Sequence, residues 1–127
     1  KPVVATHSDA YALCAHSRNL SDEHYKAIVK SGGVVGVSLA CMHLADLTNK
    51  PAADSGDLVA HLMHYRELDK NGVGLGSDFD GVDELPRGIS EPFDLYKTVS
   101  ELDIPDEDKE KLLYNNARDF LVNSLKA

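Results

Sequence analysis

The chain has 127 residues, enough for one compact domain and too few for two of ordinary size. Its formal net charge is −8 and its lysines and arginines form no cluster, so nucleic acid and anionic membrane surfaces are not expected partners. No apolar run approaches the length needed to span a bilayer, and no membrane contact is expected from this segment. Residues 1–127 are therefore treated as a single unit. Because the sequence enters a strand pattern at once and lacks a starting methionine, we expect a piece of a longer protein.

Hydrophobic periodicity and turn residues predict an alternation of strands and helices. In chain order, the predicted elements are a strand at 2–6, a helix at 21–30, a strand at 34–39, a helix at 57–70, a strand at 73–77 and helices at 92–101, 106–115 and 116–125. A long loop is expected between the second strand and the second helix, and an irregular loop over residues 7–20. The acidic segment 101–110 is interpreted as a solvated helix start, and Asn115-Asn116 as a break or kink in the tail.

The two early helices show clear local signals. Ser21 is a typical N-cap, and acidic residues follow it in the first turn, where the helix dipole favours negative charge. In the second helix, Leu58 and Leu62 belong to an apolar stripe at 3–4 spacing. His61 and His64 lie one turn apart on the same helix. We interpret these histidines as part of a solvated face rather than as a metal-binding pair.

The order strand, helix, strand, helix, strand is typical of a parallel sheet with crossover helices, which is an α/β fold. Three strands are few for an independent domain of this class, because a doubly wound sheet has about five and a barrel has eight. The sequence thus indicates part of a larger α/β unit. An isolated three-stranded sheet exposes its edges and apolar surface, which favours association with another copy of the chain.

Each predicted strand ends in a side chain of potential chemical use: His7 after the first, Ser38 in the second and Asp78 after the third. In a barrel the carboxyl ends of the strands meet at one mouth, so His7 and Asp78 can approach each other. Histidine is a common zinc ligand, and a nearby carboxylate can accept a proton from an attacking water. The alternatives are a hydrogen-bonded loop histidine at His7 and a purely turn-shaping role for Asp78 and Asp80, which precede a glycine.

Three segments carry a family resemblance: Thr-His-Ser-Asp-Ala at 6–10, Cys-Ala-His-Ser-Arg-Asn-Leu at 14–20 and Gly-Leu-Gly-Ser-Asp-Phe-Asp-Gly at 74–81. Together they resemble the membrane (renal-type) dipeptidases, the M19 metallopeptidases, over essentially the whole chain. The resemblance implies a (β/α)₈ TIM barrel of the metal-dependent hydrolase type, of which this chain would form about strands six to eight with their helices. It also implies hydrolysis of dipeptides, including those with a C-terminal D-residue, at a centre of two metals that are usually zinc.

The resemblance assigns roles to individual residues. His7 matches a zinc ligand at the end of strand six, and Arg18 matches the arginine that binds the carboxylate of the dipeptide substrate. Asp78 matches the strand-eight aspartate that handles the proton of the attacking water. Asp80 and Gly81 belong to the same motif, where we expect them to shape the turn.

The sequence departs from the family pattern in two respects. The other metal ligands of the family lie on strands that precede the first strand here, so this chain supplies a single recognisable ligand, and we expect it to be inactive in isolation. His43 stands where some relatives have an aromatic substrate contact. The alternative to a zinc-dependent dipeptidase is a non-catalytic, incomplete α/β piece that folds or self-associates without metal.

Overall fold

Three parallel strands form the centre of the structure, a computed structural model that describes residues 1–126. The strands are β1 (Val4–Ala5), β2 (Val34–Ser38) and β3 (Val73–Ser77), in the spatial order β1-β2-β3. The helices are α1 (Asp22–Lys30), α2 (Cys41–Leu44), α3 (Ser55–Leu68), α4 (Pro92–Ser100), α5 (Asp106–Glu110) and α6 (Asn116–Leu125), with a π-helical segment η1 (Lys111–Asn115) between α5 and α6. The predicted α/β alternation is confirmed, while the short helix α2 was expected to be loop.

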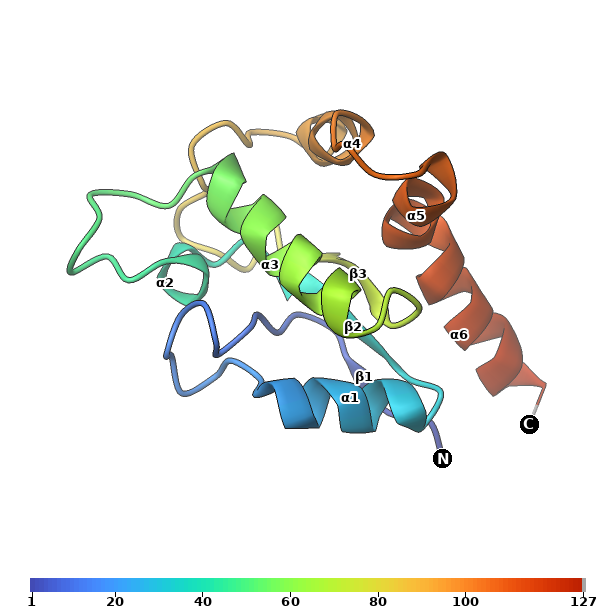
Figure 1. Ribbon diagram of the computed structural model, residues 1–127. Coiled ribbons are helices and arrows are strands. Elements are labelled where there is room, and N and C mark those ends of the chain that lie inside the picture. The colour runs from blue at the N-terminus through green and yellow to red at the C-terminus, as the bar shows by residue number, and fades with distance from the viewer. Residues whose placement is uncertain (127) are drawn as a thin grey trace.

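The helices pack on the sheet through apolar side chains. Figure 1 shows α1 and α3 crossing in front of the strands, with α5 and α6 to their right. Val35 and Val37 of β2 are fully buried, as are Leu58 and Leu62 of α3, which confirms the apolar stripe predicted for that helix. Alternate residues of β2 thus face the helices, as a pleated strand requires.

Helix α1 begins where its sequence signal predicted. The Ser21 side chain accepts a hydrogen bond from the backbone N–H of His24, so one of the free donors of the first turn is satisfied. Helix α3 begins at Ser55, two residues before the predicted start, because Asp54 and Asp57 form a reciprocal capping box. Local side-chain caps therefore decide both starts.

Two stacked tyrosines join α1 to α3. The rings of Tyr25 and Tyr65 lie 4.2 Å apart and nearly parallel, and both residues are fully buried. Each hydroxyl donates to a backbone carbonyl, Tyr25 to Asp69 at 2.7 Å and Tyr65 to Ser8 at 3.3 Å. The pair buries a large apolar area while its polar ends stay hydrogen-bonded.

Three sequence expectations on the helices were wrong. His61 is fully buried rather than solvated, and His64 is half-buried and paired with Asp22 of α1 at 2.7 Å. Asp108 is also buried, although its segment was expected to be solvated. The chain does not break at Asn115-Asn116, since η1 continues directly into α6. In each case the residue contacts a partner that lies far away in the sequence.

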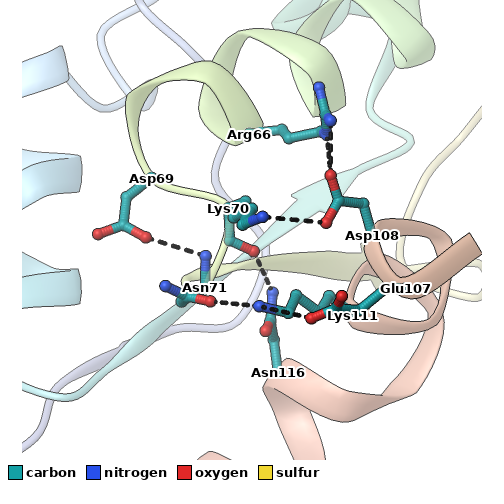
Figure 2. Close-up of polar contacts among 8 residues, drawn as sticks. All are labelled: Arg66, Asp69, Lys70, Asn71, Glu107, Asp108, Lys111 and Asn116. Carbon is teal, nitrogen blue, oxygen red and sulfur yellow. Dashed lines mark hydrogen bonds and ion pairs between the residues drawn. The ribbon is translucent and has the colours of Figure 1, made fainter. Parts of the chain in front are cut away.

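Those distant partners are clearest at the end of the sheet where β3 begins (Figure 2). Arg66 donates through Nε to the Asp108 carboxylate at 3.1 Å, and Lys70 lies 3.4 Å from its other oxygen. The Arg66 guanidinium holds the pKa of the Asp108 carboxyl below its usual range. Asn116 donates its side-chain amide to the carbonyls of Lys70 and Val73, at 2.9 and 2.8 Å. These bonds fasten the C-terminal helices to the turn between α3 and β3.

Glycines bring the strands close together near the opposite end. The regular register between β2 and β3 shifts between Val37 and Ser38, where a bulge falls at Gly76. A Cβ at Gly76 would collide with the Thr6 carbonyl and lie 3.0 Å from the carbonyl of Gly36. A Cβ at Gly74, on the same strand, would meet its nearest atom at an ordinary 3.7 Å.

This contrast predicts opposite outcomes for two alanine substitutions. Gly76→Ala should lower the free energy of unfolding by roughly 1–3 kcal/mol, because the added methyl overpacks a backbone contact. Gly74→Ala should raise it by about 0.4–1 kcal/mol, since the unfolded chain loses freedom without a native clash. Urea unfolding of both variants provides the measurement, and equal effects would contradict the packing described here.

Candidate functional site

The carboxyl ends of the strands open onto one cleft of about 430 Å³. His7, Arg18 and Asp78, the three residues singled out in the sequence, all line it. Cys41 and His43 of α2 form another part of the wall. Parallel pairing explains the convergence, because it places the ends of all strands at the same edge of the sheet.

His7 lies two residues after the end of β1 and is exposed to the cleft. Its Nδ1 lies 2.7 Å from the hydroxyl of Thr6, within hydrogen-bond distance. When Nδ1 carries the hydrogen it donates to Thr6, and the lone pair of Nε2 is then free for a ligand. The arrangement is that of an imidazole with one nitrogen oriented by a neighbour and the other available.

Asp78 has a backbone conformation that is uncommon outside glycine. Its φ is 64°, and within residues 1–126 it is the single residue other than glycine with a positive φ. Its backbone carbonyl accepts hydrogen bonds from the N–H groups of Gly81 and Val82. These two bonds close the turn that follows β3. A Cβ at Gly81 would lie 2.7 Å from the Asp78 carboxyl carbon, so glycine leaves the space that this side chain uses. Strained backbone of this kind is typical of functional positions.

Arg18 reaches the cleft from the loop after β1 and is exposed. Its backbone N–H donates to Nδ1 of His16 at 3.2 Å, and the next residue, Asn19, is buried. The guanidinium is thus carried by a loop that is itself anchored in the interior. A planar cation with paired donors suits a carboxylate in the cleft.

His16 and His43 form a histidine pair beside Arg18. Their ring centroids lie 4.4 Å apart. Burial, followed by the nearby charges of His16, Arg18 and His7, holds the pKa of His43 below its usual range. A neutral His43 therefore faces the cleft at neutral pH, and sequence reasoning gave no role to His16 at all.

Ser38, which the sequence predicts as a potentially reactive strand end, is fully buried and hydrogen-bonded. Its hydroxyl donates to Oδ2 of Asp9 at 2.9 Å, and its backbone N–H donates to Oδ1 at 2.7 Å. Asp9 is also fully buried, and this burial raises the pKa of its carboxyl to about 6 despite the two hydrogen bonds. The pair joins the loop after β1 to the end of β2, two residues from His7 and from Ala40, which line the cleft.

The described residues do not form a complete metal centre. Within residues 1–126, no group of three or more His, Cys, Asp or Glu side chains is placed to hold a metal ion. His7 is one accessible nitrogen donor. Both cysteines are free thiols, and burial raises the pKa of Cys14 and of Cys41, which disfavours the thiolate that binds metals.

Comparison with protein families matches residues 1–118 to the membrane dipeptidases (peptidase family M19). A Klebsiella pneumoniae protein is described as an uncharacterized protein in the pqqA 5′ region. It is 38% identical in an alignment 127 residues long, which covers 96% of this chain and 46% of that protein.

Two solved structures have the same arrangement. The crystal structure of a dipeptidase AC, a metallopeptidase of family M19, has a TM-score of 0.86 at 32% identity over 99% of this chain and 38% of that chain. A metallopeptidase from Rhodobacter sphaeroides, solved with a phosphinate mimic of the dipeptide L-Ala-D-Ala, has a TM-score of 0.84 at 31% identity over 95% of this chain and 36% of that chain. The chain thus spans less than half the length of each of these three proteins.

Helices long and apolar enough to cross a membrane are not found in the part of the chain that the structure describes.

The buried Asp9 predicts an inverse pH dependence of stability. With its pKa raised from 3.8 to about 6, the folded state keeps a proton that the unfolded state has released between these values. Stability should therefore fall as pH rises from about 4 to about 6, by on the order of 3 kcal/mol from this residue.

Asp9→Asn removes the titrating group and retains an oxygen that can accept from Ser38. The difference in unfolding free energy between this variant and the original protein, measured by urea denaturation from pH 4 to 8, should follow that fall. A difference that stays constant over this range would show that Asp9 titrates alike in both states.

Proposed function

Because the chain belongs to the membrane dipeptidase family (peptidase family M19), we propose that it forms the part of a zinc-dependent dipeptidase that binds the substrate carboxylate and manages the proton of the reaction. The observation that carries the proposal is the convergence on one cleft of His7 and Arg18, from the loop after β1, and of Asp78, from the end of β3. None of these residues is needed there for packing, since His7 and Arg18 are exposed and Asp78 is only half-buried.

Each of the three residues has a distinct task in this proposal. Arg18 binds the terminal carboxylate of a dipeptide with its paired guanidinium donors, which orients the scissile bond. Asp78 accepts a proton from the attacking water and delivers it to the leaving amine. His7 contributes Nε2 as one ligand of the metal centre. When bound, the metal supplies Lewis acidity, lowering the pKa of water and polarising the substrate carbonyl.

The remaining ligands would come from a segment outside the present sequence. We propose that β1, β2 and β3 with their helices correspond to about strands six to eight of a (β/α)₈ barrel. In support, 99% and 95% of the chain align with less than half of each of the two metallopeptidase structures, at TM-scores of 0.86 and 0.84. On this proposal the edges of β1 and β3 continue into the rest of the barrel.

The substrate class follows from the site and one relative. The relative from Rhodobacter sphaeroides was solved with a mimic of L-Ala-D-Ala. The cleft of about 430 Å³ is of the size that suits a small ligand, and Arg18 provides the cation for its free carboxylate. We propose the same class of substrate for this chain, namely dipeptides, including those with a D-residue at the carboxyl end.

The open sheet favours a second possibility, in which the chain on its own is a non-catalytic module that self-associates. Val4 on the outer strand β1 is 43% exposed, and Val3 just before it is 52% exposed. Unpaired strand edges with apolar side chains favour association between copies.

The metal content of the isolated chain tests whether ligands outside this sequence are needed, and its sedimentation tests self-association. The 127-residue chain, purified without chelator, should hold no zinc tightly and should not hydrolyse L-Ala-D-Ala, because His7 alone cannot retain the metal. Its sedimentation should depend on concentration if the module associates. Two zinc ions per chain with turnover would show that residues within this sequence complete the centre.

Substitution of Asp78 and, separately, of Asp80 tests which of these two carboxylates transfers the proton. In the complete enzyme, Asp78→Asn should lower kcat by about 10²- to 10⁴-fold, the usual contribution of a general acid or base. Asparagine tolerates positive φ well, so the turn should persist.

Asp80→Asn is the matched control, because Asp80 is exposed two residues away and does not line the cleft. It should leave kcat nearly unchanged. Equal losses in both variants, or normal turnover by Asp78→Asn, would remove Asp78 from this role.

A further inference from the structure

The short helix α2 ends in three backbone carbonyls that it cannot satisfy itself. A helix leaves its last carbonyls without partners, and α2 has only four residues. Each of the three is instead met by a side chain from elsewhere. The carbonyl of Met42 lies 3.5 Å from Sγ of Cys14, that of His43 accepts from Nδ2 of Asn19 at 2.8 Å, and that of Leu44 lies 2.9 Å from Nε2 of His61.

These contacts connect α2 to the loop that carries Arg18. Cys14 and Asn19 both belong to that loop, and His61 also reaches it, because Nδ1 accepts the backbone N–H of Ala10 at 2.9 Å. With Nδ1 accepting, His61 is neutral and its Nε2–H donates to Leu44. Two walls of the cleft, one bearing Arg18 and the other bearing His43, are thus held together from inside the protein.

Asn19 is the most direct of these connections. Its amide nitrogen donates to the carbonyl of Cys14 at 2.9 Å as well as to that of His43. Both partners are acceptors, so the orientation of the amide is determined and both of its hydrogens are used. Asn19 is buried and follows Arg18 immediately in the sequence. A shift of Asn19 would therefore move the backbone that carries the guanidinium.

We propose that Asn19 is a positioning residue that sets the placement of Arg18 relative to the α2 wall of the cleft. The inference rests on the proposed function, in which Arg18 binds the substrate carboxylate. It goes further by assigning the accuracy of that binding to a buried amide that touches no substrate. The His16 and His43 rings lie 4.4 Å apart, one on the loop that carries Arg18 and the other on α2, so their distance reports this placement.

The chain contains a matched control at the opposite end of the sheet. Asn116 is also buried, and its amide nitrogen also donates to two backbone carbonyls, those of Lys70 and Val73 (Figure 2). The two asparagines make the same pair of bonds, but only Asn19 adjoins the cleft. A serine at either position cannot bridge two carbonyls.

The experiment compares Asn19→Ser with Asn116→Ser in the complete enzyme. Three quantities are measured: the urea midpoint, kcat and KM for L-Ala-D-Ala and for its C-terminal amide, and the NMR cross-peaks between the His16 and His43 rings. We expect both variants to lose stability to a similar degree. Asn19→Ser alone should raise KM for the free dipeptide by roughly 10- to 100-fold, with a smaller change in kcat, and should weaken the cross-peaks.

The amide substrate distinguishes positioning from general damage. It lacks the carboxylate that Arg18 would bind, so its hydrolysis should change little in Asn19→Ser. A wild-type KM and unaltered cross-peaks in Asn19→Ser, or the same losses in Asn116→Ser, would overturn the proposal.

Two further outcomes remain decisive. If the complete enzyme without any substitution hydrolyses no dipeptide, the proposed function fails. The cross-peaks alone then decide whether Asn19 positions the two walls. If Asn19→Ser does not fold, Asn19→Gln replaces it, because it keeps both donors and displaces them by one methylene. An unchanged KM with unchanged cross-peaks in that variant would likewise contradict a positioning role.

Discussion

Parallel pairing of the strands is the constraint on which the candidate site depends. In a parallel sheet every strand finishes at the same edge, so the segments that follow β1, β2 and β3 must leave from one side of the molecule. His7 and Asp78 are 71 positions apart in the numbering and still border one cleft for this reason. The crossover helices α1 and α3 make such pairing possible, and together they cover the strands from the same side.

Buried polar side chains then give the loops at that edge defined positions. Asp9 bonds to Ser38, His61 connects Ala10 to Leu44, and Asn19 joins its own loop to α2. In a low-dielectric interior an unpaired polar group is costly, so each of these bonds disfavours any other arrangement of the loop. The cleft therefore has anchored walls although most of its lining belongs to loops.

The other end of the sheet is secured by different means. There, charged pairs between α3 and the C-terminal helices surround Asp108, and a single asparagine amide closes the turn before β3. Family membership is shown over residues 1–118, while the chain spans less than half of its relatives. The proposed chemistry accordingly divides between residues present here and ligands supplied by the rest of the enzyme.

Local sequence determined the alternation of strands and helices, the caps of α1 and the family motifs around His7, Arg18 and Asp78. Each of these features is encoded by a few neighbouring residues, through hydrophobic periodicity, capping side chains and turn glycines. Tertiary structure alone decided the existence of α2, the burial of His61 and Asp108, and the continuous helix through Asn116. α2 is too short to be stable by its own propensity and depends on donors from Cys14, Asn19 and His61. A buried histidine or aspartate has the same local pattern as a solvated one, because its partner lies far away in the sequence and only the folded chain brings the two together.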